Sequence, residues 1–576
     1  MARQWREDWY RRAVVYQIYP RSYADSNGDG IGDLPGIIEK LDYIQSLGVD
    51  AIWISPFYKS PMADFGYDVS DYRDVDPIFG TLEDAERLIV ETDRRDMAVV
   101  MDMVMSHTSD QHAWFIESRA DRTNAKADWY VWHDGKPGPD GKPVPPNNWR
   151  AVFGGSAWQW DEGRQQFYLH NFLSQQPDLN LHNMEVQDAL VAEAKFWLDR
   201  GVRGLRLDAI NFAMHDQALT DCPLKPGTDG SNYHDLIHLH DKNQPETLDF
   251  LRRLRTLADG YRGRFIVGEV YDDNDMAIAK EYCADETLLH TAYNFALFAP
   301  NQTAASLRQI FEAYDALPHD SWPSWPLSNH DVSRAVSRFA KEGERYKPNR
   351  HRARQLNALL MMLPGTAFMY QGEELGLPDA EIAPDQVVDP AVARGSGVAG
   401  RDPCRAPMPW DRDKEMAGFT TASESWLPMP DCYRALGATQ QDEPGSKATR
   451  DTTLTITRSL IEWRRMNIDL TASPIRFFDG LPEPLLGFAR GPERMPVTCL
   501  FNLSEDPVTV DVDAPGLALQ VVGEGVERLR ITAPPYGVLV LTPGRRSFPR
   551  WHGRLGEPGN MVPFSQTDDW AITGLG

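Results

Sequence analysis

Hydrophobic residues gather along this chain in short runs that alternate with segments of helical periodicity. Eight mostly apolar runs of five to seven residues are typical of strands buried in a parallel sheet. Between them, apolar residues recur three and four positions apart, as in helices that cover a sheet. The alternation predicts an α/β fold of eight βα units, which fits an α/β barrel. The expected strands are Ala13–Tyr19, Ala51–Ser55, Ala98–Val104, Gly204–Asp208, Phe265–Val270, His290–Phe295, Trp325–Asn329 and Thr366–Gln371. The clearest helical segments are Gly36–Leu47, Leu82–Arg95, Val186–Arg200 and Pro245–Asp259.

Two segments break this alternation. Residues 108–180 are rich in Trp, Asn, Pro and Gly and are too long for a plain βα loop, so we expect an inserted subdomain there. After a last helix at Thr453–Met466, short strands with turns occupy residues 475–543, which predicts a C-terminal β-sandwich. The barrel would then comprise residues 1–107 and 181–474, and the tail at 544–576 stays unassigned.

Composition narrows the class of protein. The chain has 576 residues, of which 42% are hydrophobic, and this excludes a disordered or collagen-like chain. A formal net charge of −25 opposes binding to nucleic-acid phosphates, and no apolar run is long enough to span a membrane. Five cysteines lack metal-like spacing, and the N-terminus shows no secretory signal. We therefore expect a cytoplasmic protein that binds neither nucleic acid nor membrane.

Polar residues mark the ends of four predicted strands. In an α/β barrel the carboxyl ends of the strands meet at one face, where active sites lie. A single carboxylate at a strand end has an ordinary alternative role, because it often caps the next helix. Carboxylates on separate strands, accompanied by an arginine and two histidines, favour a functional site, since burying unpaired ions is costly. The residues are Asp102, His107, Arg206, Asp208, Glu269, His330 and Asp331.

Two of these carboxyl groups suggest a reaction. Glycoside hydrolysis uses a pair of carboxyl groups that face one bond, one protonated and one ionised. Arg206 precedes Asp208 by two residues and would hold that carboxylate ionised as a nucleophile. Glu269 has no cation beside it in the sequence, so its pKa should rise near other carboxylates, as a general acid requires.

These residues lie within four short motifs, Asp102-Met-Val-Met-Ser-His107, Gly204-Leu-Arg-Leu-Asp-Ala209, Val267-Gly-Glu-Val270 and Ser328-Asn-His-Asp331. In order and spacing the motifs resemble those of glycoside hydrolase family 13, the α-amylase family. A fifth motif, Gln176-Pro-Asp-Leu-Asn180, is similar to that of the α-glucosidase and oligo-1,6-glucosidase branch. The resemblance covers roughly residues 8–545.

The resemblance implies a (β/α)8 TIM barrel with a subdomain inserted after strand three and a C-terminal all-β domain. This agrees with the pattern of hydrophobic residues. By the same resemblance Asp208 is the nucleophile, Glu269 is the general acid/base, and Asp331 stabilises the transition state. The residues that would contact the sugar in the innermost subsite are His107, Arg206 and His330.

Two positions depart from the family's pattern. Ser106 stands before His107, where the family usually has Asn. Ala209 follows the nucleophile, where relatives specific for α-1,6 bonds resemble each other in having Val. The second departure favours α-1,4 glucosides or sucrose over isomaltose.

The resemblance also extends to two loops that would close the pocket. One loop is similar to the family segment that supplies Tyr67 as a stacking platform and Asp64 as a ligand of the terminal glucose. The other resembles the segment whose arginine, Arg401, meets Asp64. Together they would block the non-reducing end and make the enzyme exo-acting. The alternatives are a turn residue for Asp64 and a surface cation for Arg401.

Two aromatic residues of the insertion, Phe153 and Phe172, match positions where relatives line the pocket with aromatic side chains. Ordinary packing is the alternative for both.

The segment after the first strand, Asp25-Ser-Asn-Gly-Asp-Gly-Ile-Gly-Asp33, has the ligand order of a calcium loop. Gly36 stands at its twelfth position in place of the bidentate Glu, and the family branch carries a similar loop, so we expect a structural site rather than a sensor. The sequence predicts Ca²⁺, with Mg²⁺ as an alternative and a metal-free turn as the other. The expected ligands are Asp25, Asn27, Asp29, Asp33 and the carbonyl of Ile31.

The sequence predicts a retaining, exo-acting α-glucosidase that releases glucose from the non-reducing end of short α-glucosides. A transglucosylase, a sucrose isomerase or a trehalose-forming mutase would use the same site, and these alternatives stay open. A non-catalytic barrel that serves as a binding module is disfavoured by the intact Asp208, Glu269 and Asp331. The expected partner is a small oligosaccharide or glucoside, and the sequence indicates no oligomeric state.

Overall fold

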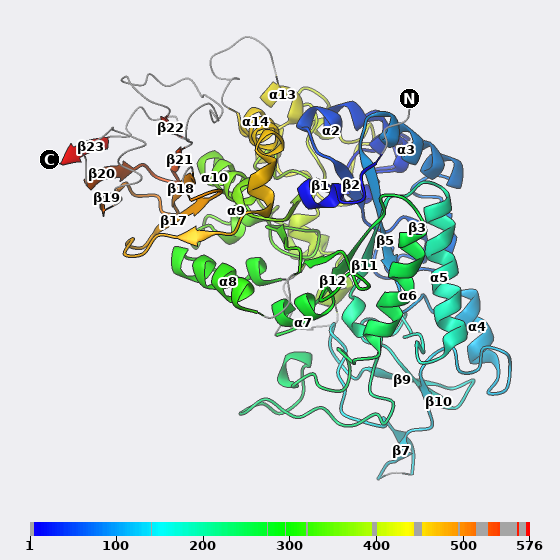
Figure 1. Ribbon diagram of the computed structural model, residues 1–576. Helices are drawn as coiled ribbons and strands as arrows, with labels where there is room; N and C mark the ends of the chain where they lie inside the picture. The colour runs from blue at the N-terminus through cyan, green and yellow to red at the C-terminus, as the bar shows by residue number, and fades with distance from the viewer. Residues whose placement is uncertain are drawn as a thin grey trace.

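Eight parallel strands form the centre of the computed structural model (Figure 1). Their order in the sheet is β13-β12-β11-β5-β2-β1-β15-β14, and the end strands β13 and β14 lie near each other, so the sheet is a nearly closed barrel. The strands are β1 (Val14–Ile18), β2 (Ala51–Ile54), β5 (Ala98–Val104), β11 (Gly204–Asp208), β12 (Phe265–Glu269), β13 (Thr291–Tyr293), β14 (Ser324–Pro326) and β15 (Thr366–Tyr370). Seven of the eight predicted runs contain one of them, the eighth, Trp325–Asn329, overlaps the end of β14, and the predicted (β/α)8 fold is confirmed.

The structure describes residues 5–139, 141–273, 275–293, 295–317, 321–393, 400–442, 452–493, 496–513, 528–541, 561–563 and 572–575. Within these residues, no helix is long and apolar enough to cross a membrane.

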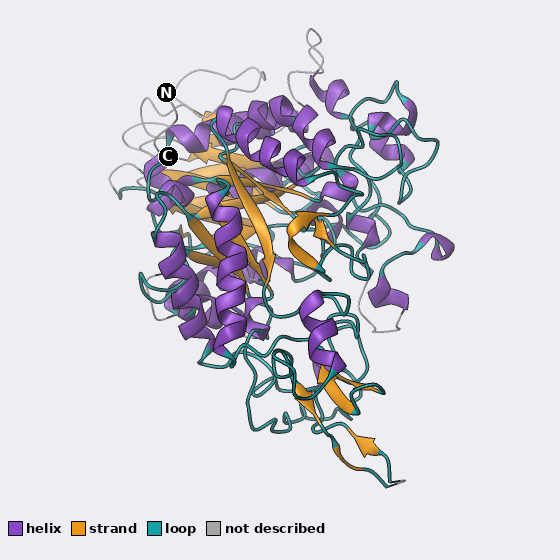
Figure 2. Ribbon diagram, turned by 90° about the vertical axis from the view of Figure 1, so that its right-hand side faces the viewer, coloured by secondary structure: helices purple, strands orange, loops and turns teal. Residues whose placement is uncertain are grey.

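Helices surround the barrel (Figures 1 and 2). The longer ones are α3 (Leu82–Arg94), α5 (Met184–Asp199), α6 (Thr247–Asp259), α8 (Ala304–Ala316), α10 (Arg350–Met362) and α14 (Thr453–Met466). The shorter ones are α1 (Leu34–Glu39), α2 (Leu41–Leu47), α7 (Asp275–Glu281), α9 (Ala335–Arg338), α11 (Pro390–Ala393), α12 (Asp431–Arg434) and α13 (Ala438–Asp442). The helix expected at Gly36–Leu47 is two helices, because Lys40 leaves the helical conformation at φ −99° and ψ 3°.

The inserted segment projects from the barrel and lies at the bottom of Figure 2. It contains α4 (Ala113–Ala120), β6 (Trp132–His133), β7 (Lys136–Pro137), β8 (Pro143–Val144), β9 (Trp158–Asp161) and β10 (Gln166–Leu169), and the hairpin of β3 (Tyr58–Lys59) and β4 (Asp71–Val75) precedes it in the chain. The expectation that residues 108–180 form the insertion alone is incomplete. The loop after β11 packs against it, since Trp149 Nε1 donates to Thr220 O at 2.9 Å and Cys222 and Leu236 share the core of the insertion.

The C-terminal region is all-β, as predicted, and is drawn in orange to red in Figure 1. One sheet contains β16 (Arg476–Phe477), β17 (Leu485–Arg490), β18 (Val497–Asn502), β21 (Val538–Leu541) and β22 (Met561–Pro563). The other contains β19 (Val508–Asp513), β20 (Arg528–Ala533) and β23 (Ile572–Leu575). The two strands β22 and β23 belong to the tail that the sequence pattern left unassigned, and both pair with strands of this region.

Candidate active site

Arg206 lies at the centre of carboxyl groups at or near the ends of three neighbouring strands. β5, β11 and β12 are adjacent in the sheet, so Asp102, Asp208 and Glu269 reach the same guanidinium. Arg206 Nη1 donates to Asp102 Oδ1 at 2.8 Å and to Asp208 Oδ1 at 2.6 Å, while Nη2 forms an ion pair with Glu269 Oε2. Nε and Nη2 also contact the Tyr293 hydroxyl at 3.1 and 3.0 Å. The guanidinium is fully buried, and its N–H groups contact the three carboxyl groups and the Tyr293 hydroxyl.

The Glu269 contact corrects one expectation from the sequence. Glu269 has no cation near it along the chain, yet in space it shares Arg206 with Asp208. Burial still raises the pKa of Glu269 to about 8; Arg206 opposes this shift, and the charges of Asp208 and Asp331 add to it. The proton on Glu269 therefore depends on burial and on carboxylate repulsion, and not on the absence of a cation.

Asp208 also differs from the expectation that Arg206 keeps its pKa low. Burial raises the pKa of Asp208 to about 7, and Arg206 only partly offsets this, because Asp102 and Asp331 repel the ionised form. Asp208 still loses its proton at lower pH than Glu269. The arrangement can thus present one ionised and one protonated carboxyl group to the same bond.

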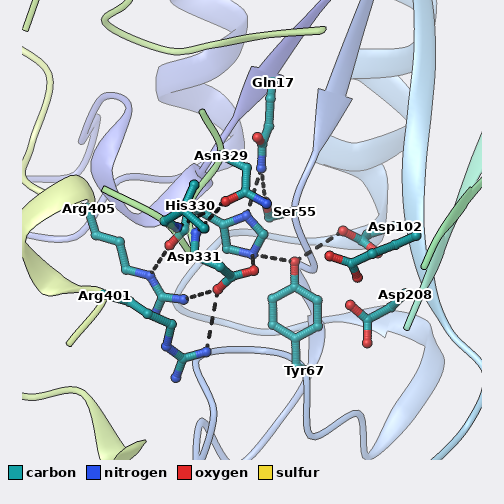
Figure 3. A network of polar contacts seen from close by, with 12 residues as sticks. Gln17, Ser55, Tyr67, Asp102, Asp208, Asn329, His330, Asp331, Arg401 and Arg405 are labelled. Atoms are coloured by element: carbon teal, nitrogen blue, oxygen red, sulfur yellow. Dashed lines mark hydrogen bonds and ion pairs between the residues drawn. The ribbon is translucent and has the colours of Figure 1, made fainter. Parts of the chain in front are cut away.

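Asp331 lies in the loop after β14, on the other side of Tyr67 from Asp208 (Figure 3). Arg405 Nη2 donates to Asp331 Oδ1 at 2.7 Å, and Arg401 Nη1 reaches the same oxygen at 3.5 Å. Burial alone would raise the pKa of Asp331, but the guanidiniums of Arg405 and Arg401 hold it well below the usual range. Asn329 Oδ1 accepts from the backbone N–H of Asp331 at 2.8 Å and fixes the turn. Asp331 is therefore a permanently ionised group.

His330 connects two sides of the site (Figure 3). Gln17 Nε2 donates to His330 Nδ1 at 2.8 Å, so the ring proton lies on Nε2 and is donated to the Tyr67 hydroxyl at 2.6 Å. Tyr67 in turn donates to Asp102 Oδ2 at 3.2 Å. Burial lowers the pKa of His330 to about 3, so the imidazole is neutral. The Tyr67 and His330 rings are stacked, with centroids 5.4 Å apart.

The two loops expected to close the pocket do meet. Arg401 Nη2 donates to Asp64 Oδ1 at 2.7 Å and to Asp389 Oδ1 at 2.8 Å. Asp389 also accepts the backbone N–H of Arg401 at 2.7 Å. All three side chains are buried, so Arg401 is not the surface cation of the alternative reading. Asp389 anchors the arginine that reaches Asp64.

The remaining predicted site residues lie beside this pair. His107 Nε2 is 3.1 Å from Tyr67 O and 3.1 Å from Gln176 Nε2, and burial lowers the pKa of His107 to about 4. Phe172 lies 5.2 Å from His107 between ring centroids. The Arg401 guanidinium lies over the ring of Phe153 at 5.0 Å. The insertion therefore brings both aromatic residues to the site.

Sequence reasoning missed six residues that hold this site together, and for half of them the sequence carries no clear signal. Asp389 and Tyr293 fall in segments without a motif. Arg405 lies four residues after Arg401 in the same loop, which was the available signal. The others are Gln17, Gln176 and Asn329, of which Gln176 and Asn329 lie inside recognised motifs.

The loop predicted to bind a metal forms a series of turns. Asp25 Oδ1 accepts from the N–H of Gly28 at 2.7 Å, and its Oδ2 accepts from that of Gly30 at 2.8 Å. Asp33 Oδ1 caps α1 by accepting from Gly36 N at 2.6 Å. These carboxylate oxygens therefore accept hydrogen bonds from backbone N–H groups.

The other expected ligands behave in the same way. Asn27 Oδ1 accepts from Asp29 N at 2.9 Å, and Asp29 Oδ1 accepts from Ile31 N at 2.8 Å. Across the described ranges, no group of three or more Asp, Glu, His or Cys side chains is placed to hold a metal ion. The contacts match the metal-free turn, and the Ca²⁺ or Mg²⁺ site stays a prediction.

Comparisons with known proteins agree with this geometry. The family model described as "Alpha amylase, catalytic domain" matches residues 17–473. The chain is 47% identical over 520 residues to a probable alpha-glucosidase of Rhizobium meliloti, covering 88% of this chain and 91% of the relative. It is 35% identical over 576 residues to an oligo-1,6-glucosidase of Bacillus cereus, covering 93% and 99%.

Solved structures are similar over the same length. The alpha-glucosyl transfer enzyme XgtA has a TM-score of 0.84 and 46% identity, covering 93% of this chain and 99% of that one. The trehalulose synthase MutB of Pseudomonas mesoacidophila has a TM-score of 0.80 and 30% identity, also covering 93% and 99%.

The metal loop gives a test of stability. If Ca²⁺ or Mg²⁺ is bound, a chelator should lower the unfolding midpoint measured by calorimetry, because a metal that binds only the folded state stabilises it. Asp29→Asn should remove that difference. Identical midpoints with and without chelator, together with no metal in elemental analysis, would leave the loop as a hydrogen-bonded turn.

Proposed function

This chain belongs to the α-amylase family of glycoside hydrolases, and we propose that it is a retaining, exo-acting α-glucosidase of short α-glucosides. The observation that carries the proposal is that Asp208 and Glu269 share one guanidinium, Arg206. Two carboxyl groups bound to the same planar cation lie close together. This supports the separation of about 5–5.5 Å in retaining enzymes over the larger gap that admits a water in inverting ones.

The proposed chemistry follows from the order of the pKa values. Asp208, which loses its proton first, attacks the anomeric carbon and forms a glucosyl ester. Glu269, whose pKa is raised to about 8, gives its proton to the departing oxygen and then takes one from water. Asp331, held ionised by two arginines, stabilises the positive charge on the sugar ring without bonding to it.

Pocket closure supports exo cleavage from the non-reducing end. The Arg401–Asp64 ion pair is buried beside Tyr67, His107 and Phe172, so a chain would not pass through at this point. Asp64 would then bind a hydroxyl of the terminal glucose, with Tyr67, His107, His330 and Arg206 around the same ring. Ala209, which stands where relatives specific for α-1,6 bonds resemble each other in having Val, supports α-1,4 glucosides such as maltose, or sucrose.

A second candidate is transfer of the glucosyl group to an acceptor sugar. The same ester would form on Asp208, and a sugar hydroxyl would replace water in the second step. Similarity to XgtA, named an alpha-glucosyl transfer enzyme, and to MutB, one variant of which was crystallised with sucrose, supports this candidate.

The five cysteines are free in the structure, which fits the predicted cytoplasmic location.

Replacement of the pocket residues tests exo cleavage. Asp64→Ala should lower kcat/KM for maltose about 5- to 150-fold, since a lost hydrogen bond to a buried charged group is worth about 1–3 kcal/mol. Arg119→Ala, which breaks an ion pair with Asp161 in the insertion, is the matched control and should leave kcat/KM unchanged. The native enzyme should release glucose singly from maltooligosaccharides. A rapid fall in starch viscosity would instead reveal an open cleft and endo cleavage.

The stereochemistry of the product tests the mechanism. Proton NMR of the first-formed glucose should show the α-anomer before the β-anomer, because two displacements restore the configuration. Glu269→Gln should accumulate a glucosyl ester on Asp208 from α-glucosyl fluoride, as detected by mass spectrometry, and Asp208→Ala should not. If β-glucose forms first, Asp208 is not the nucleophile.

A further inference from the structure

A polar network continues the pairing of β11 and β12 beyond the ends of these strands. Asn211, three residues after Asp208, is fully buried. Its Nδ2 donates to Tyr271 O at 3.0 Å, and its Oδ1 accepts from Tyr271 N at 3.3 Å. The Asn211 carboxamide thus forms hydrogen bonds with both the N–H and the carbonyl of Tyr271, which lies two residues after Glu269. The segment that follows Asp208 is tied to the segment that follows Glu269.

Lys242 makes the second bond to the same backbone group. Its Nζ donates to Tyr271 O at 2.8 Å, so this carbonyl accepts from both Lys242 and Asn211. Only 1% of the Lys242 surface is exposed. The ammonium lies 5.0–5.4 Å from the ring centroids of Phe212, Tyr233 and Tyr271. Burying an unpaired ammonium is costly. The three aromatic rings and the polar partners of Lys242 offset this cost and hold the ammonium in place.

Asp272 and Asn243 close the network into a ring. Lys242 Nζ lies 3.0 Å from Asp272 Oδ2, which also accepts from Asn243 Nδ2 at 2.7 Å. Asn243 Oδ1 in turn accepts from Asn211 Nδ2 at 2.9 Å. Asp272 and Asn243 each contact two of these side chains, and Lys242 and Asn211 close the ring through the backbone carbonyl of Tyr271.

The Glu269 carboxyl has little side-chain support of its own. Among the described residues, its polar contacts are with the N–H of Ala209 and with Arg206. Both contacts lie on the side of β11. The backbone of Glu269 pairs with Tyr293 of β13, and the segment that follows Glu269 leaves the sheet and is fixed at Tyr271.

We infer that Lys242 and Asn211 are positioning residues for the general acid, which hold Glu269 at the height of the glycosidic oxygen. The inference rests on the proposed function, since it assumes that Glu269 protonates the leaving group. The inference predicts that loss of either residue affects substrates differently, according to their leaving group. A misplaced acid slows cleavage of bonds whose leaving group needs a proton, and spares those whose leaving group departs unaided.

The test compares two donors on each variant. The constant kcat/KM reports glucosylation alone, so it separates acid assistance from the later attack of water. Lys242→Met should lower kcat/KM for maltose about 10- to 100-fold, the effect of a misplacement near 1 Å. With α-glucosyl fluoride, which needs no acid, the loss should stay within about threefold.

Asn243→Gly is the second variant. The φ of Asn243 is 57°, which glycine adopts without strain, so this substitution removes only the amide that joins Asn211 to Asp272. It should show the same selectivity with a smaller loss, and it carries the test if Lys242→Met does not fold. Lys225→Met is the matched control, because Lys225 pairs with the neighbouring Asp273 at the surface. This control should leave both constants unchanged.

Equal losses on both donors, or no loss on either, would overturn the inference and leave the network as a structural anchor. Failure of the proposed function looks different. In that case Asp208→Ala would retain turnover of α-glucosyl fluoride, whatever Lys242→Met does.

Discussion

One buried guanidinium sets the electrostatics of this site. Arg206 projects from β11 between the side chains of β5 and β12, and three carboxyl groups compete for it. A single positive charge cannot neutralise three negative ones in a dry interior, so protons stay on the carboxyl groups to higher pH than they would in water. The pKa values rise to about 6 for Asp102, about 7 for Asp208 and about 8 for Glu269, with burial as the main cause in each case.

Asp331 shows the opposite balance a short distance away. Here one carboxylate meets two guanidiniums, those of Arg405 and Arg401, and its pKa falls. The contrast separates a group that must stay ionised from groups that exchange a proton. It results from the number of cations available to each carboxylate, and Asp331 is also the most exposed of the four, with 28% of its side-chain surface accessible. Arg401 also extends this balance to Asp64 at the closed end of the pocket.

The sequence predicted the barrel well because a strand buried on both faces, such as Ala98–Val104, is a nearly continuous apolar run. The strand ends also brought the catalytic candidates to one face. Contacts between residues far apart in the sequence could not be predicted from the pattern. Spacing placed Arg206 beside Asp208 alone, whereas the adjacent strand adds Glu269 to the same cation. Asp389 and the loop that carries Lys242 lack regular periodicity, so only the folded chain reveals their partners.

The pH dependence of kcat/KM for maltose tests the shared guanidinium most directly. Turnover requires Asp208 ionised and Glu269 protonated, so the rate should rise as Asp208 loses its proton and fall as Glu269 does. Because these groups interact, the two limbs report apparent pKa values of the pair. We expect both limbs to lie above the pH range of ordinary carboxyl groups, because burial raises the pKa of Asp208 and of Glu269. A broad plateau whose acidic limb lies near 4, the value of an ordinary carboxyl group, would show that the three carboxylates do not share one cation in the way described.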